Sequence, residues 1–378
     1  MLTDDIFDDI RPFNDDEMPE AISFLSKSQE VANIVDYLYP DKDNNVFMKK
    51  LSCIKTIDEL QMEIVFPIVR DVLKKTTSAV VQDGLNKLSK EKSYLFISCH
   101  RDIVMDPCIL EFLLVDNGFK TSSISFGDNL LLSPALRYIA KCNKMFTVKR
   151  GDSLKNLLQH SKVLSMYIRN QITQENQSVW IAQRGGRTKD GNDRTDQGIL
   201  KMFFMSKPDD FVGGFNEVNV VPIAISYEYE PCAFFKVNEV YNRRRGPYVK
   251  KNGEDYISIK TGIQQYKGNV AFDFCNQLTE EELSDAGYKE KNMRFRELAD
   301  IIDKRIIESY KLWKNNYIAY DLLNVSDHFS DKYSLEDKKI FVEYMENGLC
   351  NLCGDYDELK DIFLHLYANP VINKNFIK

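Results

Sequence analysis

The stretch 93-SYLFISCHRDIVMDPCILEFLLVDNG-118 sets the pattern from which the fold can be predicted. Residues 93–98 form a short apolar run, which is typical of a buried strand, and residues 106–118 have the composition of a helix. Asp106 is the expected N-cap of that helix, Pro107 lies in its first turn and Gly118 stops it. A strand that leads directly into a helix is the unit from which parallel sheets are built.

The same alternation continues along the chain. Further strands are predicted over 122–126, 145–149, 178–182, 218–229 and 269–274, and helices over 132–143, 153–172, 198–205 and 278–313. Residues 20–92 and the last 60 residues read as helical. We therefore predict an α/β fold with a mixed, largely parallel sheet flanked by helices, a helical N-terminal region and a helical C-terminal extension. The predicted boundaries are 1–92, 93–318 and 319–378.

Composition and charge exclude several classes of protein. The net charge of −7 argues against general nucleic-acid binding, which depends on a basic surface. No run approaches 18 uncharged apolar residues, so a membrane-spanning helix is not expected. Residues 1–20 contain eight acidic residues and one Arg, unlike a signal peptide, so we expect the protein inside the cell. Basic residues nevertheless gather at 144–155, 183–195 and 242–251, which suggests an anionic ligand or solvated loops.

The eight cysteines are expected to be free thiols, because a chain inside the cell meets a reducing environment. Cys350 and Cys353 form a single CxxC pair. A structural zinc site needs about four ligands, and no second pair accompanies this one, so no metal is predicted.

His100 is followed by Arg and Asp, which is also the catalytic-loop signature of protein kinases. A kinase needs Asn five residues after that Asp, where this chain has Pro107, and no Asp-Phe-Gly follows. A Cys–His pair between Cys99 and His100 is disfavoured too, because adjacent side chains of an extended segment point opposite ways.

Four blocks in order resemble the glycerolipid acyltransferases, especially the glycerol-3-phosphate and lysophosphatidate acyltransferases. The family's first block is His, four residues, then Asp. The matching positions of this chain, within residues 93–230, are His100 and Asp106 in the first block, Gly127, Asn129, Lys149 and Arg150 in the second, Gly185, Gly186 and Arg187 in the third, and Pro222 in the fourth.

The chain departs from the family pattern at two places. Five residues separate His100 from Asp106, so Asp102 is an alternative partner for the histidine. Arg184 stands where the family usually has Glu, which bears on acceptor binding and on activity. The added positive charge of Arg184 suits a phosphate, although the basic residues of this block would also be consistent with a solvated loop.

The resemblance implies acyl transfer from acyl-CoA or an acyl-carrier protein to a hydroxyl of glycerol-3-phosphate or lysophosphatidate, with His100 as general base and Asp106 orienting it. The residues expected to bind substrate or phosphate are Gly127, Asn129, Lys149, Arg150, Arg184, Gly185, Gly186, Arg187 and Pro222. No cofactor is implied beyond the donor substrate. Peripheral association with the inner face of the membrane is expected, with residues 242–251 as a candidate contact. Two alternatives stay open: an inactive homologue that binds lipid or acyl carrier, and an acyl thioesterase.

Overall fold

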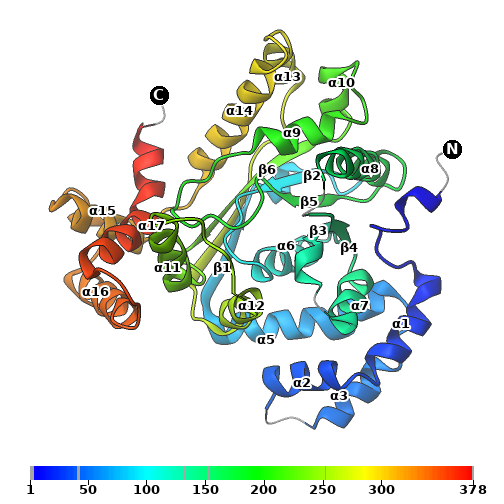
Figure 1. Ribbon diagram of the computed structural model, residues 1–378, viewed down its shortest axis with the longest axis horizontal. Coiled ribbons are helices and arrows are strands. Elements are labelled where there is room, and N and C mark those ends of the chain that lie inside the picture. The colour runs from blue at the N-terminus through cyan, green and yellow to red at the C-terminus, as the bar shows by residue number, and fades with distance from the viewer. Residues whose placement is uncertain (1–3, 41–42, 132, 151–152, 252, 377–378) are drawn as a thin grey trace.

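The computed structural model describes residues 4–40, 43–131, 133–150, 153–251 and 253–376 (Figure 1). Leu132, at the start of a predicted helix, and Gly151 and Asp152, in the first basic stretch, lie outside the described residues.

A seven-stranded sheet forms the centre of the molecule, with strand order β1-β7-β6-β2-β5-β3-β4. Neighbouring strands run parallel except β6 and β7, which are antiparallel. The strands are β1 Thr77–Asp83, β2 Leu95–Ser98, β3 Ser123–Gly127, β4 Met145–Val148, β5 Val179–Ala182, β6 Val220–Tyr227 and β7 Gly268–Phe274. The predicted mixed, largely parallel sheet is confirmed.

Apolar runs in the sequence predicted the central strands correctly because these strands are buried on both faces of the sheet. All four residues of β2 are buried, and Ile97 pairs with Ile181 on one side and Pro222 on the other. Helices α8, α9 and α14 lie on one side of the sheet, and α5, α6 and α7 on the other (Figure 1).

The helices occupy three stretches of the chain. The N-terminal ones are α1 Met18–Leu25, α2 Gln29–Leu38, α3 Asn44–Leu51, α4 Ile57–Leu60 and α5 Phe66–Thr76, with a π-helical turn at Gln61–Val65. Those between the strands are α6 Met105–Asp116, α7 Pro134–Cys142, α8 Leu154–Thr173, α9 Gln197–Phe204, α10 Phe211–Asn216, α11 Ala233–Arg243 and α12 Glu254–Gln264. After the sheet follow α13 Glu280–Gly287, α14 Met293–Ser309, α15 Lys314–Asn324, α16 Leu335–Leu349 and α17 Tyr356–Phe376. Short 3-10 turns lie at Asp4–Phe7, Asp15–Glu17, Leu85–Lys87, Asp128–Leu130 and Ser330–Lys332.

The prediction that residues 20–92 are helical is wrong for residues 77–83. The chain leaves the helical conformation after Thr76, and residues 77–83 form β1, which pairs with β7 at the edge of the sheet. The segment TTSAVVQD is rich in β-branched residues, which favour a strand. Pairing with β7, a strand nearly 190 residues later in the chain, is a tertiary effect that local periodicity does not report.

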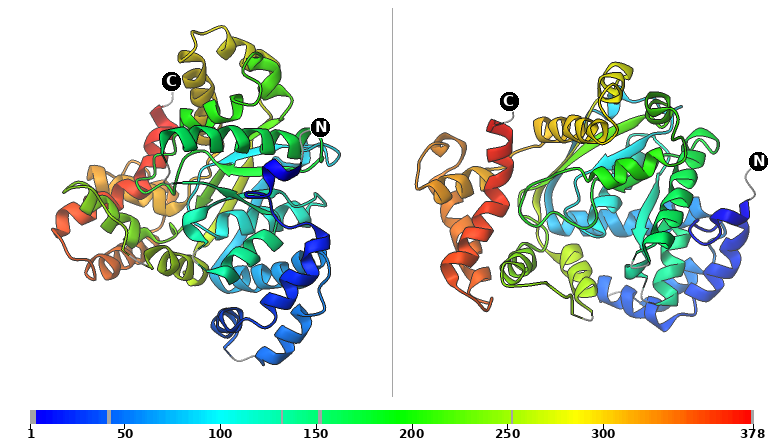
Figure 2. Two further views of the ribbon diagram at one scale, coloured as in Figure 1. Left: turned by 45° about the vertical axis from the view of Figure 1, so that its right-hand side comes forward. Right: turned by 45° about the horizontal axis from the view of Figure 1, so that its top comes forward.

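Three helices were not predicted. α10 contains Gly213 and Gly214, and α12 contains several β-branched residues, so both have weak local helix signals. α11 is stabilised by packing, because Val237 and Tyr241 join an apolar cluster with the C-terminal helices α15, α16 and α17 (Figure 2). Within the described residues, no helix is both long enough and apolar enough to cross a membrane.

Glu111, on α6, is a residue at which the pH dependence of stability can be tested. Its carboxylate is 5% exposed and accepts a hydrogen bond from Ser122 N at 2.6 Å. Burial raises the pKa of Glu111 from 4.5 to about 7. The folded state therefore holds a proton that the unfolded chain releases earlier, and stability is lost as the pH rises from about 4.5 through 7.

Glu111→Gln keeps an acceptor for Ser122 N and removes the ionisation. The free energy of unfolding of this variant should equal that of the wild type near pH 4.5 and exceed it by about 2–3 kcal/mol at pH 8. Urea unfolding at the two pH values measures this. An equal difference at both would show that Glu111 ionisation does not limit stability.

Candidate active site

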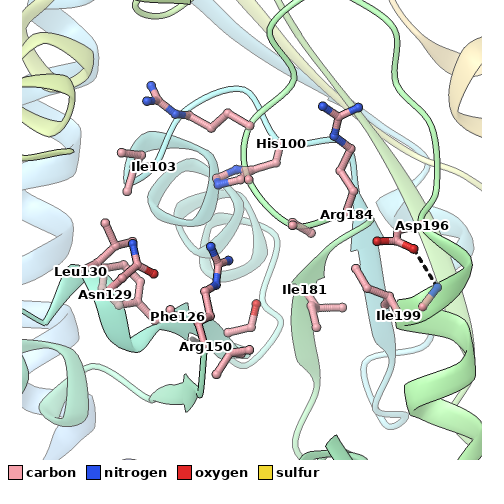
Figure 3. Close-up of a pocket in the computed structure, with 18 of the residues that line it drawn as sticks. His100, Ile103, Phe126, Asn129, Leu130, Arg150, Ile181, Arg184, Asp196 and Ile199 are labelled. Atoms are coloured by element: carbon pink, nitrogen blue, oxygen red, sulfur yellow. Dashed lines mark hydrogen bonds between the residues drawn. The ribbon is translucent and has the colours of Figure 1, made fainter. Parts of the chain in front are cut away.

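Residues that follow four parallel strands border a single cleft of about 360 Å³. His100 follows β2, Asn129 follows β3, Arg150 follows β4 and Arg184 follows β5, and all four lie around the cleft in Figure 3. Parallel strands end at the same edge of a sheet, and ligands of open α/β sheets bind outside that edge. The sheet topology therefore brings sequence blocks that are far apart along the chain together at one cleft.

His100 is paired with Asp106 and not with Asp102. His100 Nδ1 lies 2.9 Å from Asp106 Oδ2, which also accepts the backbone N–H groups of Arg101 at 2.6 Å and Asp102 at 2.9 Å. The hydroxyl of Tyr227, on β6, donates to Asp106 Oδ1 at 2.8 Å. Asp106 is completely buried, whereas the His100 side chain is 14% exposed and borders the cleft. With Nδ1 engaged, Nε2 is the ring nitrogen left for a ligand.

The prediction that Asp106 caps α6 is wrong. The helix begins at Met105, and Asp102 Oδ1 accepts the backbone N–H groups of Val104 at 2.9 Å and Met105 at 2.8 Å. Asp102 therefore accepts hydrogen bonds from the backbone N–H groups at the helix start. Asp106 lies inside the first turn and pairs with His100. Gly118 follows the helix with φ of +78°, as predicted for its stop.

Among the basic residues of the third block, Arg187 has the surroundings best suited to binding a ligand. It borders the cleft, is only 8% exposed, and its Nη1 is buried without a hydrogen-bond partner among the described residues. A buried cationic donor without a partner is costly, so an anion in the cleft would satisfy it. Lys189 is instead paired with Glu239 at 2.6 Å, and Arg194 is 61% exposed. The solvated-loop interpretation thus fits Arg194 alone of these three.

The glycines of the blocks leave room at the cleft. A side chain at Gly127 would approach Asn129 Oδ1 to 2.5 Å and Arg150 Nε to 3.2 Å, so glycine allows both residues to lie where they do. Gly185 and Gly186 also border the cleft, and Gly186 has φ of +83°, which favours glycine. Apart from the adjacent residues in the chain, no described atom lies within 4 Å of a Cβ built at either of these two positions, so this turn is open to a ligand.

Two predicted ligand-binding residues lie elsewhere. Lys149 borders a separate, smaller cavity and approaches Asp9 to 3.9 Å. Successive side chains of an extended segment alternate, which explains why Arg150 reaches the cleft and Lys149 does not. Pro222 is buried in β6, where its carbonyl accepts a hydrogen bond from Cys275 N at 2.9 Å. It borders neither cavity, so its position is that of a sheet residue.

Apolar side chains form much of the cleft wall. They are Ile103, Phe126, Leu130, Val148, Leu164, Trp180, Ile181, Ile199 and Met202. The Trp180 ring meets the His100 ring edge-on, with centroids 5.7 Å apart, and its Nε1 donates to Ser98 Oγ at 2.9 Å. The cleft therefore combines a cationic rim with an apolar wall, which suits an amphipathic ligand.

Sequence reasoning missed the groups that surround the His100 loop. Tyr227 is 121 residues from Asp106 in sequence. Lys250 and Asp255, from the segment before α12 and its first turn, pair with each other at the cleft. Arg101, Asp193, Glu230 and Lys236 form a buried ionic cluster behind the histidine. The His-Arg-Asp tripeptide drew attention to Arg101, but no spacing rule connects it to the others.

The span that matches a family model contains residues of all four blocks. Residues 79–226 match the family model for the Acyltransferase domain. Among solved structures, the chain is similar to the 1-acyl-sn-glycerophosphate (LPA) acyltransferase PlsC from Thermotoga maritima, with 12% sequence identity and a TM-score of 0.38 over 77% of this chain and 95% of that chain. Comparison with curated protein sequences gave no match.

Proposed function

This chain carries an acyltransferase domain over residues 79–226, and from that premise we propose that it transfers a fatty acyl group from a thioester donor to a hydroxyl of glycerol-3-phosphate or lysophosphatidate. The pairing of His100 Nδ1 with the buried Asp106 at 2.9 Å, beside a cleft with a cationic rim, is the observation that carries the proposal. The donor is acyl-CoA or an acyl-carrier protein.

The chemistry follows from the dyad. His100 Nε2 takes the proton of the acceptor hydroxyl as its oxygen attacks the thioester carbonyl. Asp106 fixes the imidazole tautomer and stabilises the imidazolium that forms. Backbone N–H groups of the open Gly185–Gly186 turn are suitable donors to the tetrahedral oxyanion. When the carbon–sulfur bond breaks, the thiolate takes the proton back from His100, so that an ester and a free thiol leave.

Arg187 is the proposed ligand of the acceptor phosphate, since a guanidinium can bind phosphate through two parallel hydrogen bonds. Arg187→Met should raise the KM for the phosphorylated acceptor by about tenfold or more and change kcat less. The matched control is Lys149→Met, which removes a cation that lies outside the cleft. Steady-state kinetics with varied acceptor measure both. Equal KM values for the two variants would contradict this role for Arg187.

Arg184 replaces an expected carboxylate at the same rim. It borders the cleft beside Arg187, on the loop that follows β5. The substitution adds positive charge where the acceptor phosphate is proposed to bind, which is consistent with an anionic acceptor and does not remove either member of the dyad.

We also propose that the lipid enters from an anionic membrane surface at an entrance patch made of Val249, Lys250, Lys251, Tyr256 and Ile257. Val249 is 81% exposed and Ile257 53% exposed, and Lys250 borders the cleft itself. Arg245, earlier in the same basic stretch, is instead bound to Glu358 of α17 at 2.5 Å. Exposed apolar residues next to lysines are suited to an anionic bilayer.

Val249→Asp combined with Ile257→Asp should therefore lower cosedimentation with phosphatidylglycerol-containing vesicles by at least about fivefold. Val325→Asp combined with Leu335→Asp is the matched control, because these residues are 95% and 87% exposed and lie in the C-terminal extension. Equal loss of vesicle binding in both double variants would show that the entrance patch is not the membrane contact.

The reaction class is tested by following thioester consumption with acyl-CoA or acyl-carrier-protein donors, each with glycerol-3-phosphate, lysophosphatidate or no acceptor. Acceptor-dependent turnover is expected. Turnover that ignores the acceptor would identify a thioesterase. Donor or lipid binding without any turnover would identify an inactive homologue and overturn the proposed reaction.

A further inference from the structure

The peptide group between Arg101 and Asp102 is bonded at both ends. Its carbonyl oxygen accepts a hydrogen bond from Lys236 Nζ, on α11, at 2.7 Å. Its N–H donates to Asp106 Oδ2 at 2.9 Å, and the same oxygen is paired with His100. Hydrogen bonds that share one polarisable group strengthen one another. The ammonium group therefore makes this N–H a stronger donor to the carboxylate that orients the histidine.

Lys236 is held in a buried and electrically balanced cluster. Its side chain is 1% exposed, and Nζ also binds Glu230 Oε1 at 2.5 Å. Arg101, which is completely buried, binds Glu230 at 3.2 Å and Asp193 through its other terminal nitrogen. Two cations thus face two carboxylates. Among the described residues Arg101 Nε has no hydrogen-bond partner, whereas both terminal nitrogens of its guanidinium are bonded. A balanced cluster of this kind fixes geometry, because breaking one member leaves another buried charge unpaired.

The C-terminal helices close this cluster from water. Glu230 N donates to the hydroxyl of Tyr367, which lies on α17 and is 1% exposed. Asn316, on α15, donates to the carbonyl of Tyr367 at 2.9 Å. The guanidinium of Arg101 lies over the ring of Tyr310, 5.2 Å from its centroid. Helix α17 packs against α11, which carries Lys236 (Figure 2).

We propose that Lys236 is a positioning residue, which acts through the Arg101–Asp102 peptide to hold Asp106 in hydrogen-bonding position for His100. The C-terminal extension supports this role by excluding water from the ammonium group of Lys236. The proposal rests on the proposed function of His100 as general base. It assigns a role in the reaction to helices none of whose described residues borders the cleft.

Several charged or titratable groups surround His100. They are Asp106 and Asp102 on its own loop and the following helix, Arg150 after β4, Arg184 and Arg187 after β5, Tyr227 on β6, and the cluster of Arg101, Asp193, Glu230 and Lys236. A change at Lys236 is therefore best made without altering the net charge of this set.

The test variant is Lys236→Met combined with Glu230→Gln, which removes one charge of each sign and leaves Arg101 paired with Asp193. We expect kcat to fall about 10- to 100-fold with the acceptor KM within about twofold. Without the hydrogen bond from Nζ to the Arg101 carbonyl, the N–H of Asp102 donates less strongly to Asp106, whose carboxylate then favours the protonated imidazole more strongly. The acid limb of the pH profile of kcat/KM should then move to higher pH by about 0.5 unit. An unchanged kcat and an unchanged acid limb would overturn the proposal.

Leu359→Ala is the control for a purely structural role. Leu359 is 1% exposed, lies on α17 and belongs to the apolar cluster of the extension, and it is no member of the ionic cluster. It should lower thermal stability without moving the acid limb. If it reproduces both the loss of kcat and the shift of the acid limb, the extension acts by general stability and the positioning role is wrong.

A second readout does not depend on turnover. The NMR titration midpoint of His100, assigned among the four histidines by its absence in His100→Ala, should lie higher in the Lys236→Met/Glu230→Gln variant than in the wild type. If the wild type shows no acceptor-dependent turnover, the proposed function fails, and this midpoint still decides the positioning role. An unchanged midpoint would reject it.

Discussion

His100→Ala is expected to lower kcat for acyl transfer by about 10²- to 10⁴-fold, because the acceptor hydroxyl loses the group that takes its proton. The KM for the acceptor should change little, since Arg187 and the other cleft residues remain. Removing a partly exposed ring that borders the cleft should also leave the fold intact. Steady-state thioester consumption with the best donor and acceptor pair measures the loss.

His328→Ala is the matched control, because His328 is exposed and lies in the C-terminal extension, where it contacts Phe329. Its kcat should equal that of the wild type. Activity of His100→Ala within about tenfold of wild type would mean that His100 is not the base, since a positioned general base contributes at least about a hundredfold.

Asp106→Asn should lower kcat by about 10³- to 10⁴-fold while keeping the local structure. The amide oxygen can accept from His100, Arg101 and Asp102 as the carboxylate does, and the amide nitrogen can donate to the hydroxyl of Tyr227. What is lost is the negative charge. A neutral amide does not favour the protonated imidazole, so the acid limb of the pH profile of kcat/KM should move to lower pH.

Asp102→Asn separates the two candidate partners of the histidine. Asn can still satisfy the N–H groups of Val104 and Met105 at the start of α6. We expect the position of its acid limb to match that of the wild type, with any change confined to thermal stability. A shift with Asp102→Asn and none with Asp106→Asn would contradict the pairing of His100 with Asp106.

The sequence by itself determined strands β2 to β7 and most of the helices that alternate with them. Strands β2, β5 and β6 are recognisable because nearly all of their residues are buried. Burial on both faces demands apolar runs, which are visible in the sequence without knowledge of the neighbouring strands. The blocks around His100, Gly127, Arg150 and Arg187 were identified by resemblance to a family. They meet because parallel strands bring their carboxyl ends to one edge of the sheet. Asp106 was the expected partner of His100 and Asp102 the alternative, and in the structure His100 Nδ1 lies 2.9 Å from Asp106 Oδ2.

Only the tertiary structure decided which side chains meet. β1 exists because β7 pairs with it, and local periodicity had indicated a helix there. Lys149 and Arg150 are adjacent and carry the same charge. Because their side chains alternate, Lys149 approaches Asp9 and Arg150 borders the cleft. Tyr227 and Lys236 reach the His100 loop from more than 100 residues away. Periodicity indicates which residues of a segment are buried. The contacts within a site depend instead on how the loops that follow different strands position their side chains.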